Sequence, residues 1–158
     1  MKFPKRKSIR LARELYQGPM IGMATICFFD RLNVIENKLA PHLTSQIVNI
    51  SKKSDINILL YCIMPDHLHL ILNIEHTDQN FLDTITYFKR KTAFELKEKL
   101  SLKQLWQDRF IDRIIRDEKE LEKLVRYILD NPVRKNLVND YKHWPYFGGK
   151  YYDYYRRR

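Results

Sequence analysis

The chain is predicted to fold as an α+β sandwich of the ferredoxin-like or RRM-like kind, with four mostly antiparallel strands and helices packed on the sheet. Two observations carry this prediction. Four short stretches show the alternating or continuous apolar pattern of strands, and three longer stretches have apolar residues at helical spacing. Their order is strand, helix, strand, strand, helix, strand, helix. The 158 residues are expected to form one domain, 1–158, because that length supports a single hydrophobic core.

The first half of the chain supplies three strands and one helix. A strand at 20–29 is apolar on both faces, which is typical of the interior of a sheet. A helix is expected over 38–53, where Pro41 is tolerated because it lies in the first turn. A strand at 56–63 turns through a Met-Pro-Asp sequence into an antiparallel strand at 67–74. The apolar stripe of the helix consists of Leu39, Leu43, Ile47 and Ile50.

The second half supplies two helices and the fourth strand. A helix is expected over about 79–100 and a strand over 109–116. The third helix is expected over 117–130, where Asp117 and Glu120, three residues apart, resemble a capping box. Pro132 is expected to end it, because the residue before a proline avoids helical backbone angles. The stripe of the 79–100 helix is Phe81, Ile85, Phe88, Thr92 and Leu96.

The strand at 67–74 carries two histidines, His67 and His69, one residue apart. Because side chains alternate between the faces of a strand, both imidazoles lie on one face. The other face is the core face, and it carries Leu68, Leu70, Leu72 and Ile74. Two neutral imidazoles at this spacing can bind one divalent ion. The alternative is a pair of half-buried histidines that bond to their neighbours. A metal site would need a third ligand from elsewhere in the chain.

The third predicted helix presents a tyrosine and an asparagine together. Tyr127 lies at the edge of the apolar stripe, and Asn131 follows four residues later on the same side. A phenol and an amide can therefore point the same way from the end of this helix. The alternatives are an ordinary packing tyrosine and an ordinary helix-capping asparagine. The stripe itself is Leu121, Leu124, Val125 and Ile128.

The positive charge of the chain is concentrated at its two ends. The net charge is +10, and residues 1–13 hold six basic residues and no acidic one. Residues 131–158 hold seven basic residues against two acidic ones, so the middle of the chain is nearly neutral. Such ends are typical of a polyanion binder, although solvated tails are the alternative. We therefore distinguish a basic lead-in (1–19) and a basic aromatic tail (139–158). The chain is expected to be irregular from the start of this tail through Gly148 and Gly149.

The same composition argues against several classes of protein. No apolar run reaches membrane-spanning length, and the N-terminus lacks the apolar core of a signal peptide. Cys27 and Cys62 are far apart and form no Cys-x-x-Cys motif, as expected in a reducing compartment. No glycine-rich phosphate loop is present over 23–147. These features predict a soluble cytoplasmic protein with no membrane partner.

Several motifs together resemble one family. The sequence Met64-Pro65-Asp66-His67-Leu68-His69-Leu70-Ile71 resembles the histidine–hydrophobic–histidine motif of the single-tyrosine HUH transposases, which act on single-stranded DNA. Three further segments, 105–110, 116–118 and 127–134, resemble the C-terminal signature of the REP-associated tyrosine transposases. In this order the segments span about 20–147, and their combination is specific.

The resemblance implies a catalytic site. His67 and His69 match the two motif histidines that hold a divalent metal, Mg²⁺ or Mn²⁺, and Tyr127 on the third helix matches the nucleophile. Asn131 falls where related enzymes place a polar third ligand. Asp66 stands where the family usually has Asn, and is a secondary metal candidate or a residue that stiffens the turn. The implied reaction is attack of the tyrosine on a phosphodiester, giving a 5′-phosphotyrosine and a free 3′-hydroxyl that can later rejoin strands.

The implied substrate is single-stranded or hairpin DNA from repetitive extragenic palindromes. The tyrosines of the tail could stack on unpaired bases, or pack on the domain instead. Two other functions stay open: a catalytically inert nucleic-acid binder derived from such a transposase, and a metal-dependent hydrolase of a small phosphate. Both monomer and homodimer occur among the related enzymes. The basic residues expected to contact DNA are Arg90, Lys91, Arg134, Lys135, Arg156, Arg157 and Arg158.

Overall fold

The computed structural model describes residues 10–54 and 56–158. Most of the basic residues predicted at the N-terminus, Lys2, Lys5, Arg6 and Lys7, lie outside the described residues.

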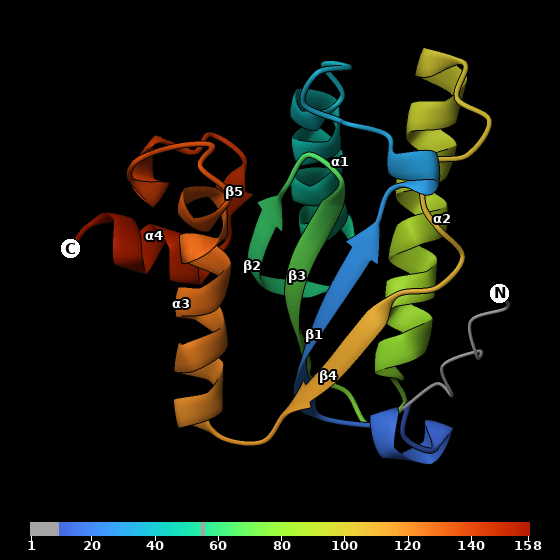
Figure 1. Cartoon of the computed structure of the whole chain (residues 1–158). Helices are drawn as coiled ribbons and strands as arrows, with labels where there is room; N and C mark the ends of the chain where they lie inside the picture. The colour runs from blue at the N-terminus through green and yellow to red at the C-terminus, as the bar shows by residue number, and fades with distance from the viewer. Residues whose placement is uncertain (1–9, 55) are drawn as a thin grey trace, which may run out of the picture.

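The centre of the molecule is one antiparallel sheet (Figure 1). Its strand order is β4-β1-β3-β2-β5, so the histidine strand β3 lies in the middle, between β1 and β2. The predicted α+β sandwich is confirmed, with five strands in place of four. The strands are β1 (Met20–Cys27), β2 (Asn57–Ile63), β3 (His67–Ile74), β4 (Ile111–Ile115) and β5 (Phe147–Gly148).

The unpredicted strand β5 is only two residues long and pairs with the edge of β2. Gly148 lies opposite Tyr61, and a Cβ added to Gly148 would come within 2.3 Å of the Tyr61 ring. The pairing therefore depends on a glycine, which allows the two backbones to approach. Strand β5 consists of only two residues, and one of them is a glycine. Such a short segment cannot show an alternating apolar pattern, so the sequence did not indicate it.

Helices cover both faces of the sheet (Figure 1). Two lie on one face, α1 (Ala40–Lys53) and α2 (Phe81–Leu100), and the predicted stripes of both are buried. The other face is covered by α3 (Glu118–Arg134) and by the short α4 (Lys150–Arg156). Short 3-10 helices are η1 (Arg13–Tyr16), η2 (Phe29–Arg31) and η3 (Tyr141–His143).

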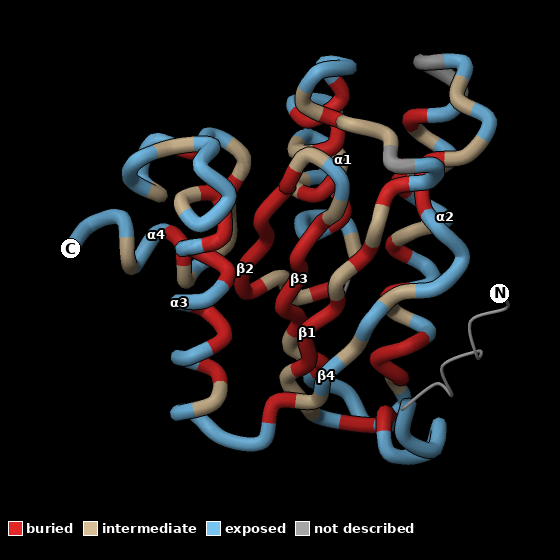
Figure 2. The backbone as a smooth tube through the Cα atoms, in the orientation of Figure 1, coloured by how far each residue is buried: buried red, intermediate tan, exposed pale blue. Residues whose placement is uncertain are grey.

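The central strands are therefore buried on both faces, as Figure 2 shows, whereas most of the edge strand β4 is exposed or only partly buried. On β3, Leu68, Leu70 and Leu72 face the α1–α2 layer and are fully buried. Ile71, which shares the histidine face, packs in a second core with α3. Helix α3 therefore lies over the face of the sheet that carries the histidines.

Helix α3 begins as predicted but ends later. The Asp117 carboxylate accepts a hydrogen bond of 2.7 Å from the backbone N–H of Glu120, as an N-cap does. The predicted end before Pro132 is wrong, because α3 continues to Arg134 with the proline inside. Proline removes only one helical hydrogen bond, and burial of Asn131 and Pro132 in the packed layer outweighs that loss.

The stretch expected to be irregular contains only the short elements η3 and β5, and the rest of the basic tail (139–158) includes α4, which packs on the sheet. The Trp144 indole N–H donates to the backbone oxygen of Ile63 at 3.0 Å, which fixes this segment to β2. Tyr152 of α4 is buried and stacks on Phe147 at 5.1 Å between ring centroids. Burial of these aromatic side chains orders the segment. No helix within the described residues is long and apolar enough to cross a membrane.

Candidate active site

The two histidines of β3 point their outer nitrogens at each other. His67 Nε2 and His69 Nε2 are 3.1 Å apart, and the rings meet edge to face. His69 is buried, with 4% of its surface exposed, whereas the His67 side chain is 16% exposed. Two imidazole nitrogens therefore meet at one point, at the border between the protein and solvent.

The inner nitrogens of both rings have partners. His69 Nδ1 lies 3.0 Å from Thr25 Oγ1, and Thr25 is directly opposite His69 in the β1–β3 register. His67 Nδ1 lies 2.6 Å from Asp66 Oδ1. When a metal-binding histidine donates its other ring N–H to an acceptor, the bond fixes the tautomer and the orientation of the ring. These two contacts leave both Nε2 atoms available to a ligand.

The electrostatics of the pair favour uncharged imidazole at His69. Burial lowers the pKa of His69 to about 3, with a further contribution from His67 that Asp66 partly opposes. Burial also disfavours ionisation of Asp66, but the hydrogen bond and charge of His67, together with Lys135, outweigh it and lower the pKa of that carboxyl. A neutral imidazole is the form that binds a metal.

Helix α3 brings the predicted asparagine and tyrosine to the same place. Asn131 is buried, and its amide nitrogen lies 2.8 Å from His69 Nε2. The Tyr127 ring centroid is 6.0 Å from that of His69, and 43% of the tyrosine is exposed. One turn of α3 thus places a buried amide against the histidine pair and an accessible phenol beside it.

The donor atoms at this point suit a divalent cation. His69 Nε2 lies within hydrogen-bond distance of both His67 Nε2 and the Asn131 side-chain amide. The amide also carries an oxygen, and its two ends are assigned only from the surrounding hydrogen bonds. In the described parts of the chain, no three His, Cys, Asp or Glu side chains lie together so as to hold a metal. The Asp66 carboxylate contacts Nδ1 of His67 and not the Nε2 atom that faces His69.

The comparison with known families fits this geometry. Residues 24–131, more than half of the chain, match the family described as transposase IS200 like. The matched stretch contains His67, His69, Tyr127 and Asn131. The chain belongs to the IS200-like transposases.

Two relatives are similar to this chain in sequence. A Haemophilus influenzae protein, provisionally named a REP-associated tyrosine transposase, is 35% identical over 95 residues, which cover 54% of each chain. The transposase therefore spans about half the length of this relative. The REP-associated tyrosine transposase of Escherichia coli K12 is 26% identical over 119 residues, covering 71% of this chain and 70% of that one.

Two solved structures share the fold of the transposase. A REP-associated tyrosine transposase bound to a REP hairpin gives a TM-score of 0.71 at 22% identity, covering 93% of this chain and 82% of that one. A provisionally assigned transposase from Deinococcus radiodurans gives 0.55 at 18% identity, covering 81% and 95% respectively.

The basic residues predicted to contact DNA do not share one surface of the transposase. The Arg134 guanidinium lies over the Tyr127 ring, 5.1 Å from its centroid, and Lys135 follows at the end of α3. By contrast, Arg90 and Lys91 belong to α2, on the opposite face of the sheet, and Lys91 pairs with Glu95 at 3.2 Å. The three C-terminal arginines, Arg156, Arg157 and Arg158, end the α4 region on the α3 side.

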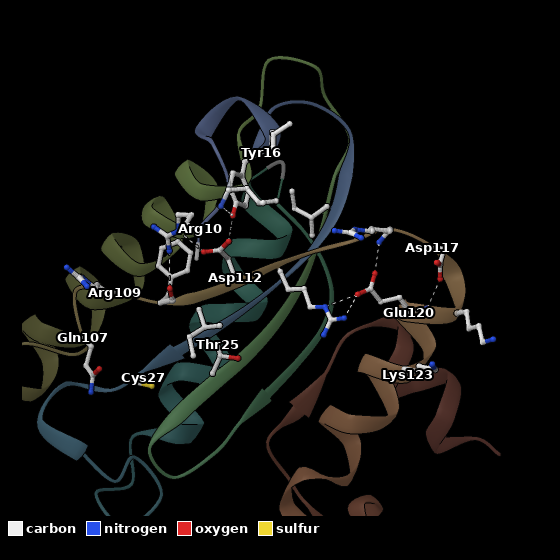
Figure 3. Close-up of a pocket in the computed structure, with 18 residues that line it drawn as sticks. Arg10, Tyr16, Thr25, Cys27, Gln107, Arg109, Asp112, Asp117, Glu120 and Lys123 are labelled. Atoms are coloured by element: carbon white, nitrogen blue, oxygen red, sulfur yellow. Dashed lines mark hydrogen bonds and ion pairs between the residues drawn. The ribbon is translucent and has the colours of Figure 1, made fainter. Parts of the chain in front are cut away.

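Two features of the site were missed from the sequence. One is Thr25, whose contact with His69 depends on strand register, a long-range property with no local signal. The other is a groove of about 1210 Å³ over the edge strand β4, here called the β4 groove (Figure 3). It is lined by residues of η1, β1, β4 and the first turns of α3, Thr25 among them.

Proposed function

We propose that this IS200-like transposase cuts and rejoins single-stranded DNA with Tyr127 as the nucleophile. The observation that carries the proposal is the meeting of β3 and α3. They bring the phenol of Tyr127 and the amide of Asn131 to the paired Nε2 atoms of the histidines. Neither a packing tyrosine nor a pair of core histidines requires such a meeting.

In the proposed reaction, the Tyr127 oxygen forms a bond to a backbone phosphorus while the bond from that phosphorus to the 3′ oxygen breaks. The phenol proton passes to water, and the leaving 3′ oxygen takes a proton from water. The products are a 5′-phosphotyrosine and a free 3′-hydroxyl, and reversal of the step joins a strand.

His67, His69 and Asn131 would hold Mg²⁺ or Mn²⁺, which when bound polarises a phosphate and offsets the developing charge. Thr25 and Asp66 would orient the two imidazoles through their Nδ1 atoms. Arg134 would add positive charge next to the phenol, where the negative phosphate must sit. In this proposal, Asp66 orients His67 and does not itself bind the metal.

We further propose hairpin DNA as the substrate. The structural neighbour with the higher TM-score is described as bound to a REP hairpin, and the E. coli relative is named REP-associated. The excess of basic residues at both ends of this chain supports a polyanionic partner.

The decisive experiment incubates labelled hairpin oligonucleotides from the flanking genomic DNA with the protein and Mg²⁺ or Mn²⁺. A denaturing gel then separates free DNA from a covalent adduct. We expect an adduct that both Tyr127→Phe and EDTA abolish. Salt-sensitive binding without an adduct, over several hairpins, would instead indicate an inert DNA-binding protein. Metal-dependent hydrolysis that survives Tyr127→Phe would indicate a hydrolase of small phosphates.

A further inference from the structure

The β4 groove adjoins the proposed active site. Thr25 and Cys27 line it, and they are the register partners of His69 and His67 in the β1–β3 pairing. Thr25 also bonds to His69 directly. A ligand in the groove would therefore lie against the strand that supports both histidines (Figure 3).

The acidic side chains that line the groove are engaged within the protein. Asp112 accepts a 2.7 Å hydrogen bond from Arg10 and another from the Tyr16 hydroxyl. Glu120 accepts from the Arg113 guanidinium and from the Arg116 backbone N–H, and Asp117 caps α3. These internal contacts offset most of the negative charge in the groove.

Basic side chains dominate the remaining charge. Arg109, Arg116, Lys119 and Lys123 also line the groove. Within residues 10–54 and 56–158, no ion pair joins Arg109, Lys119 or Lys123 to a carboxylate. The groove therefore presents positive charge to a ligand.

The two lysines belong to a row that ends at the proposed nucleophile. Lys119, Lys123 and Tyr127 are spaced four residues apart on α3, so they are neighbours on one side of the helix. All three side chains are exposed. A chain of negative charges that followed this row from the groove would reach the phenol of Tyr127.

The groove also has an exposed apolar surface. Ile111 of β4 is 67% exposed and lies opposite Thr25, and Leu11 and Leu15 from the neighbouring segment are exposed as well. A ligand that suits both the basic side chains of the groove and this apolar surface carries negative charge on its backbone and flat apolar faces on its side groups. Unpaired DNA has this character, whereas a duplex keeps its bases stacked inside.

We propose that the β4 groove binds the unpaired DNA strand that leads into the active site, with phosphates on Lys119 and Lys123 and bases over Ile111. The proposal rests on the proposed function for the direction of the strand. It assigns a place to the single-stranded part of the substrate, distinct from any surface that holds a hairpin stem.

The test compares two DNA probes: a blunt hairpin, and the same hairpin extended by an unpaired thymidine flank. Binding is measured by fluorescence anisotropy in the Tyr127→Phe background with EDTA present, so that no result depends on cleavage. Failure of the proposed reaction would appear as a missing adduct in the gel experiment. Failure of the groove proposal would appear only in these affinities.

The charge variant is Lys119→Gln/Lys123→Gln. Its matched control is Lys52→Gln/Lys53→Gln, two exposed lysines of α1 on the opposite face of the sheet. We expect the groove variant to bind the flanked hairpin about tenfold more weakly and the blunt hairpin unchanged. The slope of log affinity against log salt should fall by about 0.7 for each phosphate that the variant no longer neutralises. Equal losses of affinity on both probes, no loss, or the same loss in the control would overturn the proposal.

The apolar variant is Ile111→Ala, with Phe94→Ala on α2 as its control, because both side chains are largely exposed. We expect a several-fold loss of affinity for the flanked hairpin at an unchanged salt slope, since a base contact neutralises no phosphate. An unchanged affinity in Ile111→Ala would remove the base contact from the proposal. If the unsubstituted protein bound both hairpins equally, the groove would contribute nothing and the whole inference would fail.

Discussion

Each histidine of the site is held by a contact that differs in chemistry and in origin. Asp66 is the chain neighbour of His67, so this contact is local in the sequence. Thr25 is distant in the chain and reaches His69 only because β1 and β3 pair in one register. The grouping of His67, His69 and Asn131 could be anticipated from strand and helix periodicity together with the motif, whereas the support from Thr25 could not. Register is decided by the packing of whole strands, which local pattern does not report.

The first prediction concerns Thr25. Thr25→Val keeps the shape and the β-branch but removes the oxygen that contacts His69 Nδ1. The ring should then lose its fixed tautomer, and Mn²⁺ affinity measured by calorimetry should fall by about 10- to 100-fold. Thr25→Ser restores the oxygen and should bind Mn²⁺ nearly as the unsubstituted protein does. Nitrogen NMR of the His69 ring gives the tautomer directly. Equal Mn²⁺ affinity in the Val and Ser variants would show that the hydroxyl has no such role.

A second prediction separates the two roles considered for Asp66. Its carboxylate contacts Nδ1 of His67, so an orienting role needs only an acceptor oxygen there. Asp66→Asn retains one and should change Mn²⁺ affinity by less than about tenfold, whereas Asp66→Ala should cost about 10- to 100-fold. A carboxylate that bound the metal itself would give a different result, because Asn and Ala would then both lose most of the affinity.

At the scale of elements, α3 carries both Tyr127 and Asn131, so its two ends decide where those side chains lie. Its buried stripe and its N-cap were predictable, because both are local patterns. Its C-terminal end was not. A proline usually ends a helix, but here the backbone oxygens of Asn131 and Pro132 accept from the N–H groups of Lys135 and Leu137. These bonds close the last turn after the proline, and tertiary packing keeps Asn131 helical beside His69.

The third prediction concerns the start of that helix. Asp117→Ala removes the side-chain oxygen that accepts from the Glu120 N–H. The loss of an N-cap should lower the free energy of unfolding by about 1 kcal/mol. Urea denaturation measures the change, provided that the dependence on urea concentration stays the same. Asp117→Ser retains a capping oxygen and should recover most of the stability. If Ala and Ser were equally stable, the cap would not contribute to the stability of α3.

For the whole molecule, the sequence correctly indicated one sheet with helical layers, but it did not indicate on which face of the sheet the basic residues lie. Periodicity determines which residues of a helix are buried, so the α1 and α2 stripes were predictable. The same pattern leaves Arg90 exposed without telling which layer its helix joins, and α2 lies opposite the histidine face. The C-terminal aromatics were ambiguous for a similar reason. An aromatic side chain can stack on a base or on its own domain, and the available partner decides.

The last prediction follows from the folded C-terminal region. Removal of 150–158 would take away Tyr152, which is buried against Phe147, so truncation would disturb the fold along with any DNA contact. Substitution of the three exposed C-terminal arginines by glutamine separates the two effects. The unfolding midpoint in urea should stay unchanged. Affinity for a blunt hairpin should fall, with a salt slope reduced by about 0.9 for each phosphate that is no longer neutralised.

The charge-matched control replaces Lys52, Lys53 and Lys103, which are also exposed. If the arginine variant and this control weakened binding equally, the C-terminal arginines would add only general charge. A larger loss of affinity in the arginine variant would locate the duplex stem at the α4 end of the molecule, on the side of the sheet that α3 covers.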